Sequence, residues 1–136
     1  MRINNIVWSS IITILFQSSP TFTAVQIVEP SQFEQVIQQH YGPTVVQFAA
    51  SWCGVCTKIK DHFNTLAASS ADHNKAIIFM RVEPDDALTK KYNIPGFPTF
   101  IFFNNGKEVH RKVGVDTIKT FQADMMAILK EHHLIT

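Results

Sequence analysis

Short apolar runs alternate with amphipathic helical patterns along most of this 136-residue chain. The runs at 44–50 and 77–82 are rich in β-forming residues, as strands buried on both faces require. The segment 53–68 between them has apolar residues at helical spacing. Because parallel strands need a crossover, a strand, a helix and a second strand in this order predict a parallel arrangement.

A hairpin signal in the second half makes the predicted sheet mixed. Asn104-Asn105-Gly106 separates an apolar run at 99–103 from a second run at 108–113. Asn-Gly between two such runs is the strongest short-range indication of a hairpin. With a short strand over 24–28 and a last helix, the expected order is β-α-β-α-β-α-β-β-α. We therefore expect an α/β fold with helices on both faces of a mixed central sheet.

Capping residues predict where three helices begin. Ser31 with Glu34 three residues later has the pattern of a capping box. Asp85 or Asp86 can cap a short helix that ends near residue 92, and Asp116 is placed to cap the last helix. Each of these helices is therefore expected to begin directly after its capping residue.

The N-terminal segment has a different character from the rest of the chain. No charged residue lies between Arg2 and Glu29, and residues 6–16 form an apolar run of 11. A membrane-spanning helix needs roughly 20 such residues, and a short apolar run followed by polar residues is typical of a secretory signal peptide. We expect residues 1–24 to be a signal peptide with a poorly defined cleavage site, followed by one domain over 25–136. An uncleaved anchor and an ordinary N-terminal element are the alternatives.

Export would deliver the protein to a periplasm, the extracellular space or a secretory lumen, with no stable membrane span after the signal is removed. Lys plus Arg number 12 and Asp plus Glu 11, for a formal net charge of +1. A nucleic-acid interface needs a basic excess on one face, so nucleic acid is not an expected partner. The length predicts a single domain, which we expect to be monomeric.

Both cysteines of the chain fall in the tetrapeptide Cys53-Gly54-Val55-Cys56. Cys53 follows a predicted strand and opens a predicted helix, where unpaired N–H groups and the helix dipole stabilise a thiolate. We therefore expect the pKa of the Cys53 thiol to lie below its usual value of about 8.5. One helical turn brings Cys56 to the same face, close enough to bridge. The two would act as an exposed attacking thiol and a buried resolving thiol.

Other roles explain the two cysteines less well. A disulfide across three residues closes a small ring that restrains little of the chain. Structural zinc takes four ligands, and the six histidines show no metal-ligand spacing, so we expect no metal. A hydrolase built on Cys53 would need a paired base, and no histidine can be placed beside it. The expected redox group is the Cys53–Cys56 disulfide itself, without a further cofactor.

At these residues the sequence resembles the thioredoxin family. Four segments carry the resemblance: Phe48 to Cys56 (FAASWCGVC), Lys91 to Thr99 (KYNIPGFPT), Phe102 to Lys107 (FFNNGK), and Val113-Gly114. Together they span about residues 25–133. The resemblance implies a thioredoxin fold and a thiol–disulfide oxidoreductase that serves cell redox homeostasis. Its implied partners are client proteins with thiols or disulfides and a redox partner protein.

The resemblance also implies roles for individual residues. Cys53 matches the attacking cysteine and Cys56 the resolving cysteine, and Pro98 matches a cis proline that faces the disulfide. The implied substrate-binding residues surround these three: Trp52, Gly54, Val55, Phe97, Pro98, Thr99 and Gly114.

Three positions depart from the family pattern in ways that bear on chemistry. Val55 replaces the usual proline or histidine between the cysteines, a position that tunes the reduction potential. Gln47 stands where the family has a buried aspartate, and Phe79 aligns with the partner lysine. Both members of a buried charge pair are therefore expected to be absent, which avoids leaving one charge alone. No side chain at position 47 could then take the proton from Cys56.

These departures keep a second hypothesis open. The chain could be a thioredoxin-fold binding or assembly module that holds a partner protein in the groove around the motif, with little redox turnover. The sequence also leaves open whether the protein acts as a reductant, an oxidant or an isomerase.

Overall fold

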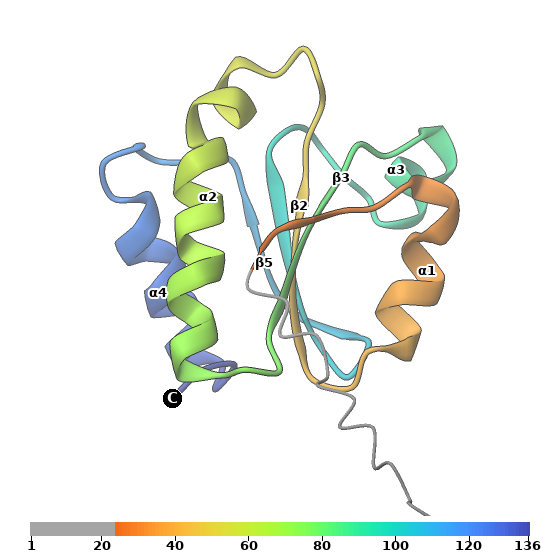
Figure 1. Cartoon of the computed structure of the whole chain (residues 1–136). Helices are drawn as coiled ribbons and strands as arrows, with labels where there is room; N and C mark the ends of the chain where they lie inside the picture. The colour runs from red at the N-terminus through yellow and green to blue at the C-terminus, as the bar shows by residue number, and fades with distance from the viewer. Residues whose placement is uncertain (1–23) are drawn as a thin grey trace, which may run out of the picture.

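The computed structural model describes residues 24–136, so the predicted signal peptide lies outside the described residues except for its last position. Five strands form one sheet in the order β1-β3-β2-β4-β5. The strands are β1 (Gln26–Ile27), β2 (Pro43–Phe48), β3 (Ile78–Val82), β4 (Thr99–Asn104) and β5 (Lys107–Val113). The helices are α1 (Pro30–Gln39), α2 (Gly54–His73), α3 (Asp86–Lys91) and α4 (Phe121–Glu131). Figure 1 shows α1 and α3 on one face of the sheet and α2 and α4 on the other, which confirms the expected α/β arrangement.

The pairing of the strands decides where the cysteine motif lies. β2 runs parallel to β3 but antiparallel to β4, so the mixed sheet is confirmed. In that antiparallel register Phe48, at the end of β2, is opposite Thr99, at the start of β4. The residues that follow β2 therefore meet the residues that precede β4. The hairpin between β4 and β5 turns through Asn105 and Gly106, both at positive φ as a tight turn of this kind requires.

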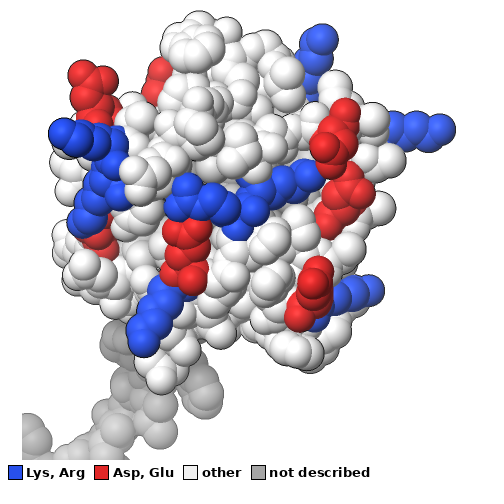
Figure 2. Space-filling model, turned by 180° about the vertical axis from the view of Figure 1, so that it is seen from behind, with Lys and Arg blue, Asp and Glu red and all other residues white. Residues whose placement is uncertain are grey.

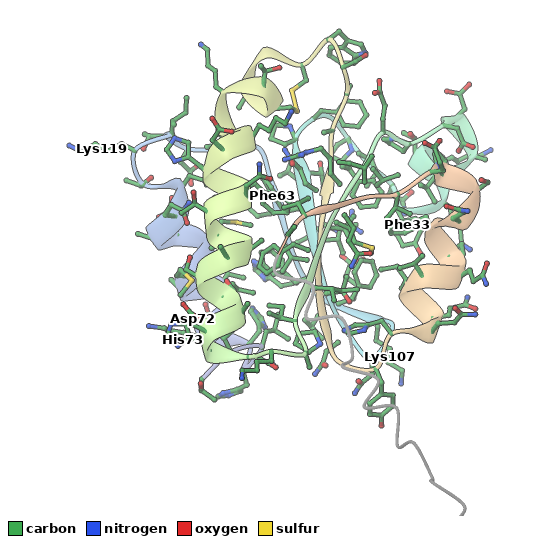
Figure 3. All side chains as sticks on the ribbon, in the orientation of Figure 1. Phe33, Phe63, Asp72, His73, Lys107 and Lys119 are labelled. Carbon is green, nitrogen blue, oxygen red and sulfur yellow. A yellow bond between two sulfur atoms is a disulfide. The ribbon has the colours of Figure 1, made fainter. Side chains whose placement is uncertain are left out.

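Side chains fill both spaces between the sheet and its helices. In Figure 3 Phe63 projects from α2 toward one face of the sheet, and Phe33 projects from α1 toward the opposite face. Both rings are fully buried. Every residue of β2 is buried, because this central strand is covered on both faces. Met125 lies fully inside the core between α4 and the sheet, and Met126 packs partly against it.

Two predicted helix caps are wrong. The helix α1 begins at Pro30, which is favoured at a first helical position, and Glu29 precedes it without a side-chain cap. The carboxylate of Glu34 instead lies 2.8 Å from Lys91 Nζ, on α3. The helix α4 begins only at Phe121, after a turn.

The residue predicted to cap α4 has a different partner. The carboxylate of Asp116 accepts a hydrogen bond from Lys112 Nζ at 2.7 Å. The cap predicted for α3 is confirmed, because Asp85 Oδ1 accepts a hydrogen bond from the backbone N–H of Leu88 at 2.8 Å. A predicted cap is therefore present where the capping side chain has no partner in another element.

The described surface carries charges of both signs. On the face shown in Figure 2, Lys and Arg side chains are interspersed with Asp and Glu. Over residues 24–136 no helix has both the length and the apolar character needed to cross a membrane.

Candidate active site

The two cysteines form a disulfide at the start of α2, with their Cα atoms 5.3 Å apart. Cys53 is the N-cap of the helix, in an extended conformation, and its Sγ accepts a hydrogen bond from the backbone N–H of Cys56 at 3.1 Å. An unpaired N–H group at a helix start is a donor that stabilises negative charge. The sulfur that would be a thiolate after reduction thus already occupies the position of an N-cap acceptor.

The exposure of the two cysteines differs from the expectation of one open and one buried sulfur. Both Cys53 and Cys56 are only 6% exposed in this disulfide form. The bridge and the cap turn the Cys53 sulfur toward the helix, where Ala49, Ala50 and Phe97 pack around the pair. The exposed groups of the motif are instead the neighbours of the cysteines.

An apolar surface surrounds the disulfide. The Trp52 side chain is 77% exposed and its ring packs edge-on against Phe97, with centroids 5.7 Å apart. Val55, between the cysteines, is also exposed, and so is Val113 at the end of β5. The structure therefore brings Trp52, from the loop after β2, against Phe97, from the loop before β4, while Val55 is exposed in the first turn of α2. Gly54, in that first turn, has open space where a side chain would project.

The loop that faces the motif contains the only cis peptide bond of the described residues, Phe97–Pro98, as the resemblance implied. The Pro98 carbonyl accepts a hydrogen bond from the N–H of Gly114 at 2.8 Å. Gly114 has φ 77°, and nothing lies within 4 Å of the position that a side chain would occupy there. Thr99 is fully buried, and its hydroxyl donates to the Gly96 carbonyl at 2.7 Å. This hydrogen bond stabilises the loop before β4.

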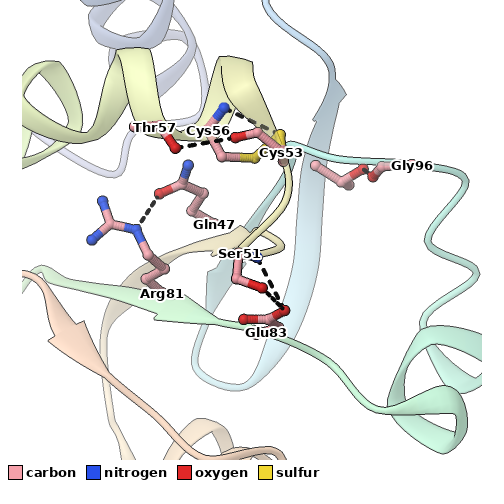
Figure 4. The surroundings of a disulfide bond; sticks show 9 residues. Gln47, Ser51, Cys53, Cys56, Thr57, Arg81, Glu83 and Gly96 are labelled. Carbon is pink, nitrogen blue, oxygen red and sulfur yellow. Dashed lines mark hydrogen bonds between the residues drawn. A yellow bond between two sulfur atoms is a disulfide. The ribbon is translucent and has the colours of Figure 1, made fainter.

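The residue opposite Gln47 in the sheet is a cation, so a positive charge lies beside Gln47 even though Phe79 aligns with the family's partner lysine. In the β2–β3 register Gln47 pairs with Arg81, and Val45 pairs with Phe79. Arg81 Nε donates to Gln47 Oε1 at 2.8 Å, and Figure 4 shows this bond to the left of the disulfide. Phe79 instead packs edge-on against Phe63 in the core. Arg81 therefore supplies a positive charge beside Gln47, where no carboxylate is present, and burial lowers the pKa of Arg81.

The prediction missed Arg81 because residues 79 and 81 point to the same face of β3. Side chains alternate with a period of two in a strand, so a shift of two residues leaves the pattern of faces unchanged.

A cavity of about 250 Å³ opens beside Cys56. The charged residues that line it are Lys60 from α2, Arg81 from β3 and Glu83 just after β3. Glu83 Oε1 accepts hydrogen bonds from the backbone N–H and the hydroxyl of Ser51, at 3.0 and 3.1 Å. Among residues 24–136 no group of three or more histidine, cysteine or acidic side chains could hold a metal ion.

Comparison with known proteins points to one family. The family model described as Thioredoxin matches residues 24–127. Thioredoxin-1 of Caenorhabditis elegans is 39% identical over 87 residues, which cover 62% of this chain and 72% of the relative. The protein disulfide-isomerase erp38 of Neurospora crassa is 31% identical over 112 residues, covering 78% of this chain and 30% of the relative.

Solved structures agree with the sequence comparisons. Thioredoxin of Plasmodium falciparum superposes with a TM-score of 0.65 and 25% identity, covering 79% of this chain and 98% of that chain. Thioredoxin of Malassezia sympodialis gives a TM-score of 0.64 and 28% identity, covering 80% and 93%.

Proposed function

Because the chain belongs to the thioredoxin family and is a thiol–disulfide oxidoreductase, we propose that Cys53 and Cys56 exchange disulfides with client proteins. The observation that carries the proposal is the bond from the Cys56 N–H to the Cys53 sulfur, which holds that sulfur at the start of α2. A thiolate there is stabilised by the helix end and is the nucleophile that exchange requires.

The exchange has two steps. The Cys53 thiolate attacks one sulfur of a client disulfide, and the other client sulfur leaves as a thiolate that takes up a proton. The Cys56 thiolate then attacks the Cys53 sulfur, so that the bond to the client breaks and the second client sulfur leaves. The client gains two electrons and two protons, and the Cys53–Cys56 pair is oxidised. A second redox protein would reduce this disulfide, or the same steps would run in reverse to oxidise a client.

An extended client segment would lie on the apolar surface beside the disulfide. The exposed side chains of Trp52 and Val55, with Phe97, offer apolar contact, and Gly114 leaves the approach to Pro98 open. Backbone pairing beside Pro98 would be a short form of strand addition. Gly54 and Thr99 complete the set of proposed substrate-binding residues, Gly54 by leaving room and Thr99 by bracing the loop.

A trapping experiment tests the proposal. Cys56→Ser removes the resolving thiol, so mixed disulfides between Cys53 and clients should accumulate and vanish on addition of reductant. The matched control is the double variant Cys53→Ser, Cys56→Ser, which should trap nothing. If Cys56→Ser traps no client and the parent chain does not accelerate the reduction of insulin disulfides, the proposed exchange is wrong.

Partner binding without turnover is the second candidate, and Gln47 favours it because an amide cannot act as a proton acceptor for Cys56. In that case the apolar surface around Trp52 would hold a partner protein whatever the state of the cysteines. The double serine variant discriminates between the two candidates. If the double serine variant keeps the function of the parent chain, this supports the binding module and contradicts disulfide exchange.

We also propose that the chain is exported and that its mature domain begins near residue 25. The support is the uncharged stretch before Glu29 and the family match, which begins at residue 24. The intact mass of the protein isolated after expression with its full sequence measures this directly. A mass that includes residues 1–24 would contradict cleavage.

A further inference from the structure

We propose that Gln47, held in place by Arg81, donates a hydrogen bond to the Cys56 thiolate that forms when Cys56 resolves the mixed disulfide. Arg81 is then a positioning residue, which acts on Cys56 through the amide of Gln47. The inference rests on the proposed function, because it assigns a role within the second step of the exchange.

The orientation of the Gln47 amide follows from the chemistry of its neighbour. An arginine side chain has only hydrogen-bond donors, so the atom that faces Arg81 Nε at 2.8 Å must be the amide oxygen. The NH₂ group therefore points the other way. In Figure 4 that end of Gln47 is turned toward the first turn of α2, where Cys56 and Thr57 lie. Arg81 thus determines that a donor, rather than an acceptor, faces the active-site helix.

This donor has no partner among the protein groups of the described residues in the disulfide form. Gln47 is fully buried, and its Nε2 has no hydrogen-bond partner among residues 24–136. The same holds for Arg81 Nη2. Buried donors are nearly always paired in folded proteins, so two unpaired donors in one layer call for an explanation. An anion that exists only during the reaction cycle would satisfy them.

The charge in this layer favours an anion as well. The Arg81 guanidinium lies over the Phe63 ring, 5.6 Å from its centroid, and its bond to Gln47 is to a neutral group. Arg81 and Cys56 line the same cavity, together with Lys60 and Glu83. The carboxylate of Glu83 is engaged with Ser51. The charged groups around Cys56 are therefore two cations and one acid that already has partners.

In the mixed disulfide the Cys56 thiol gives its proton to solvent through the cavity, and the thiolate accepts the hydrogen bond from Gln47 Nε2. The thiolate attacks the Cys53 sulfur, the bond between Cys53 and the client sulfur breaks, and the client leaves as a thiolate that takes a proton from solvent. A carboxylate at position 47 would accept the Cys56 proton, whereas this amide stabilises the sulfur after the proton has left.

The test is the pKa of the Cys56 thiol in Cys53→Ser, measured by the pH dependence of its alkylation. In this background Gln47→Leu removes the donor and Arg81→Met removes the group that orients it, and each should raise the pKa by about one unit or more. Arg81→Lys keeps the charge and should recover part of the shift. Lys60→Met removes an exposed cation at the cavity and is the control, with an expected shift well below that of Arg81→Met.

A further variant separates this role from a structural one. Gln47→Glu gives Arg81 a carboxylate partner and should fold at least as stably as the parent, while Gln47→Leu should be less stable. Both should raise the Cys56 pKa, because one places a negative charge beside the thiolate and the other removes its donor. An unchanged pKa in Gln47→Leu, or a lowered pKa in Gln47→Glu, would overturn the inference. If the parent chain still reduces insulin in that event, the inference fails and the proposed function stands.

Discussion

The sulfur of Cys53 serves as the N-cap of α2, and replacing it in the reduced protein tests how much that cap stabilises the domain. Cys53 has extended backbone angles, and its Sγ accepts from the Cys56 N–H at 3.1 Å. Cys53→Ser keeps an acceptor at this place, and Cys53→Ala removes it. Because Cys53 is only 6% exposed, water replaces the lost acceptor poorly.

The expected magnitude follows from this burial. Loss of an N-cap acceptor costs about 1 kcal/mol at a typical site, and a buried N–H left without a partner costs about 1–3 kcal/mol. We therefore expect Cys53→Ala to be about 1–2 kcal/mol less stable than Cys53→Ser. For a domain of roughly 100 residues, where 1 kcal/mol corresponds to about 4–8 °C, this lowers the midpoint of thermal unfolding by about 4–16 °C.

The assay is thermal unfolding followed by circular dichroism in excess reductant, so that no variant contains the disulfide. Cys56→Ala is the matched control, because Cys56 is also only 6% exposed. This variant measures the effect of losing a buried sulfur while the N-cap acceptor at Cys53 stays in place. Cys53→Ala should therefore melt below both Cys53→Ser and Cys56→Ala. Equal midpoints for Cys53→Ala and Cys53→Ser would show that the sulfur does not cap the helix.

Two further expectations concern sites away from the disulfide. His110 packs against His132 with ring centroids 4.6 Å apart, and burial followed by the charge of His132 lowers the pKa of His110 below 6.5. The unfolded chain then binds a proton before the native chain does, so stability should fall as the pH drops below about 6.5. Urea midpoints at about pH 7.5 and pH 5.5 should differ less in His110→Gln than in the parent, and an equal difference would refute this. Asp85→Ala removes the cap of α3 and should cost about 1 kcal/mol in urea unfolding, whereas Asp86→Ala keeps the cap and should cost clearly less.

Features encoded within a few residues were predictable from the sequence. The strand that precedes Cys53, the turn at Asn105-Gly106 and the cap at Asp85 all follow from local patterns and are present in the structure. The turn and the cap depend on hydrogen bonds that close within a few residues, and the strand is indicated by its run of β-forming residues. The cis bond before Pro98 came from the resemblance, since the dipeptide alone predicts a trans bond.

Features that depend on another element were predicted less well. The pattern at Ser31 and Glu34 satisfies a capping box, but Pro30 begins the helix and Lys91 of α3 binds the Glu34 carboxylate. Likewise Asp116 pairs with Lys112 of β5. In each case a partner that the local pattern does not include takes the side chain. Exposure of Cys53 was also misjudged, because it depends on packing by Phe97 from a distant loop.

The pairing of Gln47 with Arg81 shows why register matters for chemistry as well as for folding. With Phe79 opposite Gln47, the layer behind the disulfide would be uncharged and would have no influence on Cys56 beyond excluding water. With Arg81 there, one positive charge remains and fixes the direction of the Gln47 amide. In the first arrangement Gln47 would only fill the place of the family's aspartate. In the second arrangement its amide NH₂ group is oriented as a hydrogen-bond donor. On this reasoning the pH dependence of the resolving step follows the titration of Cys56 itself, since position 47 has no proton to give or accept.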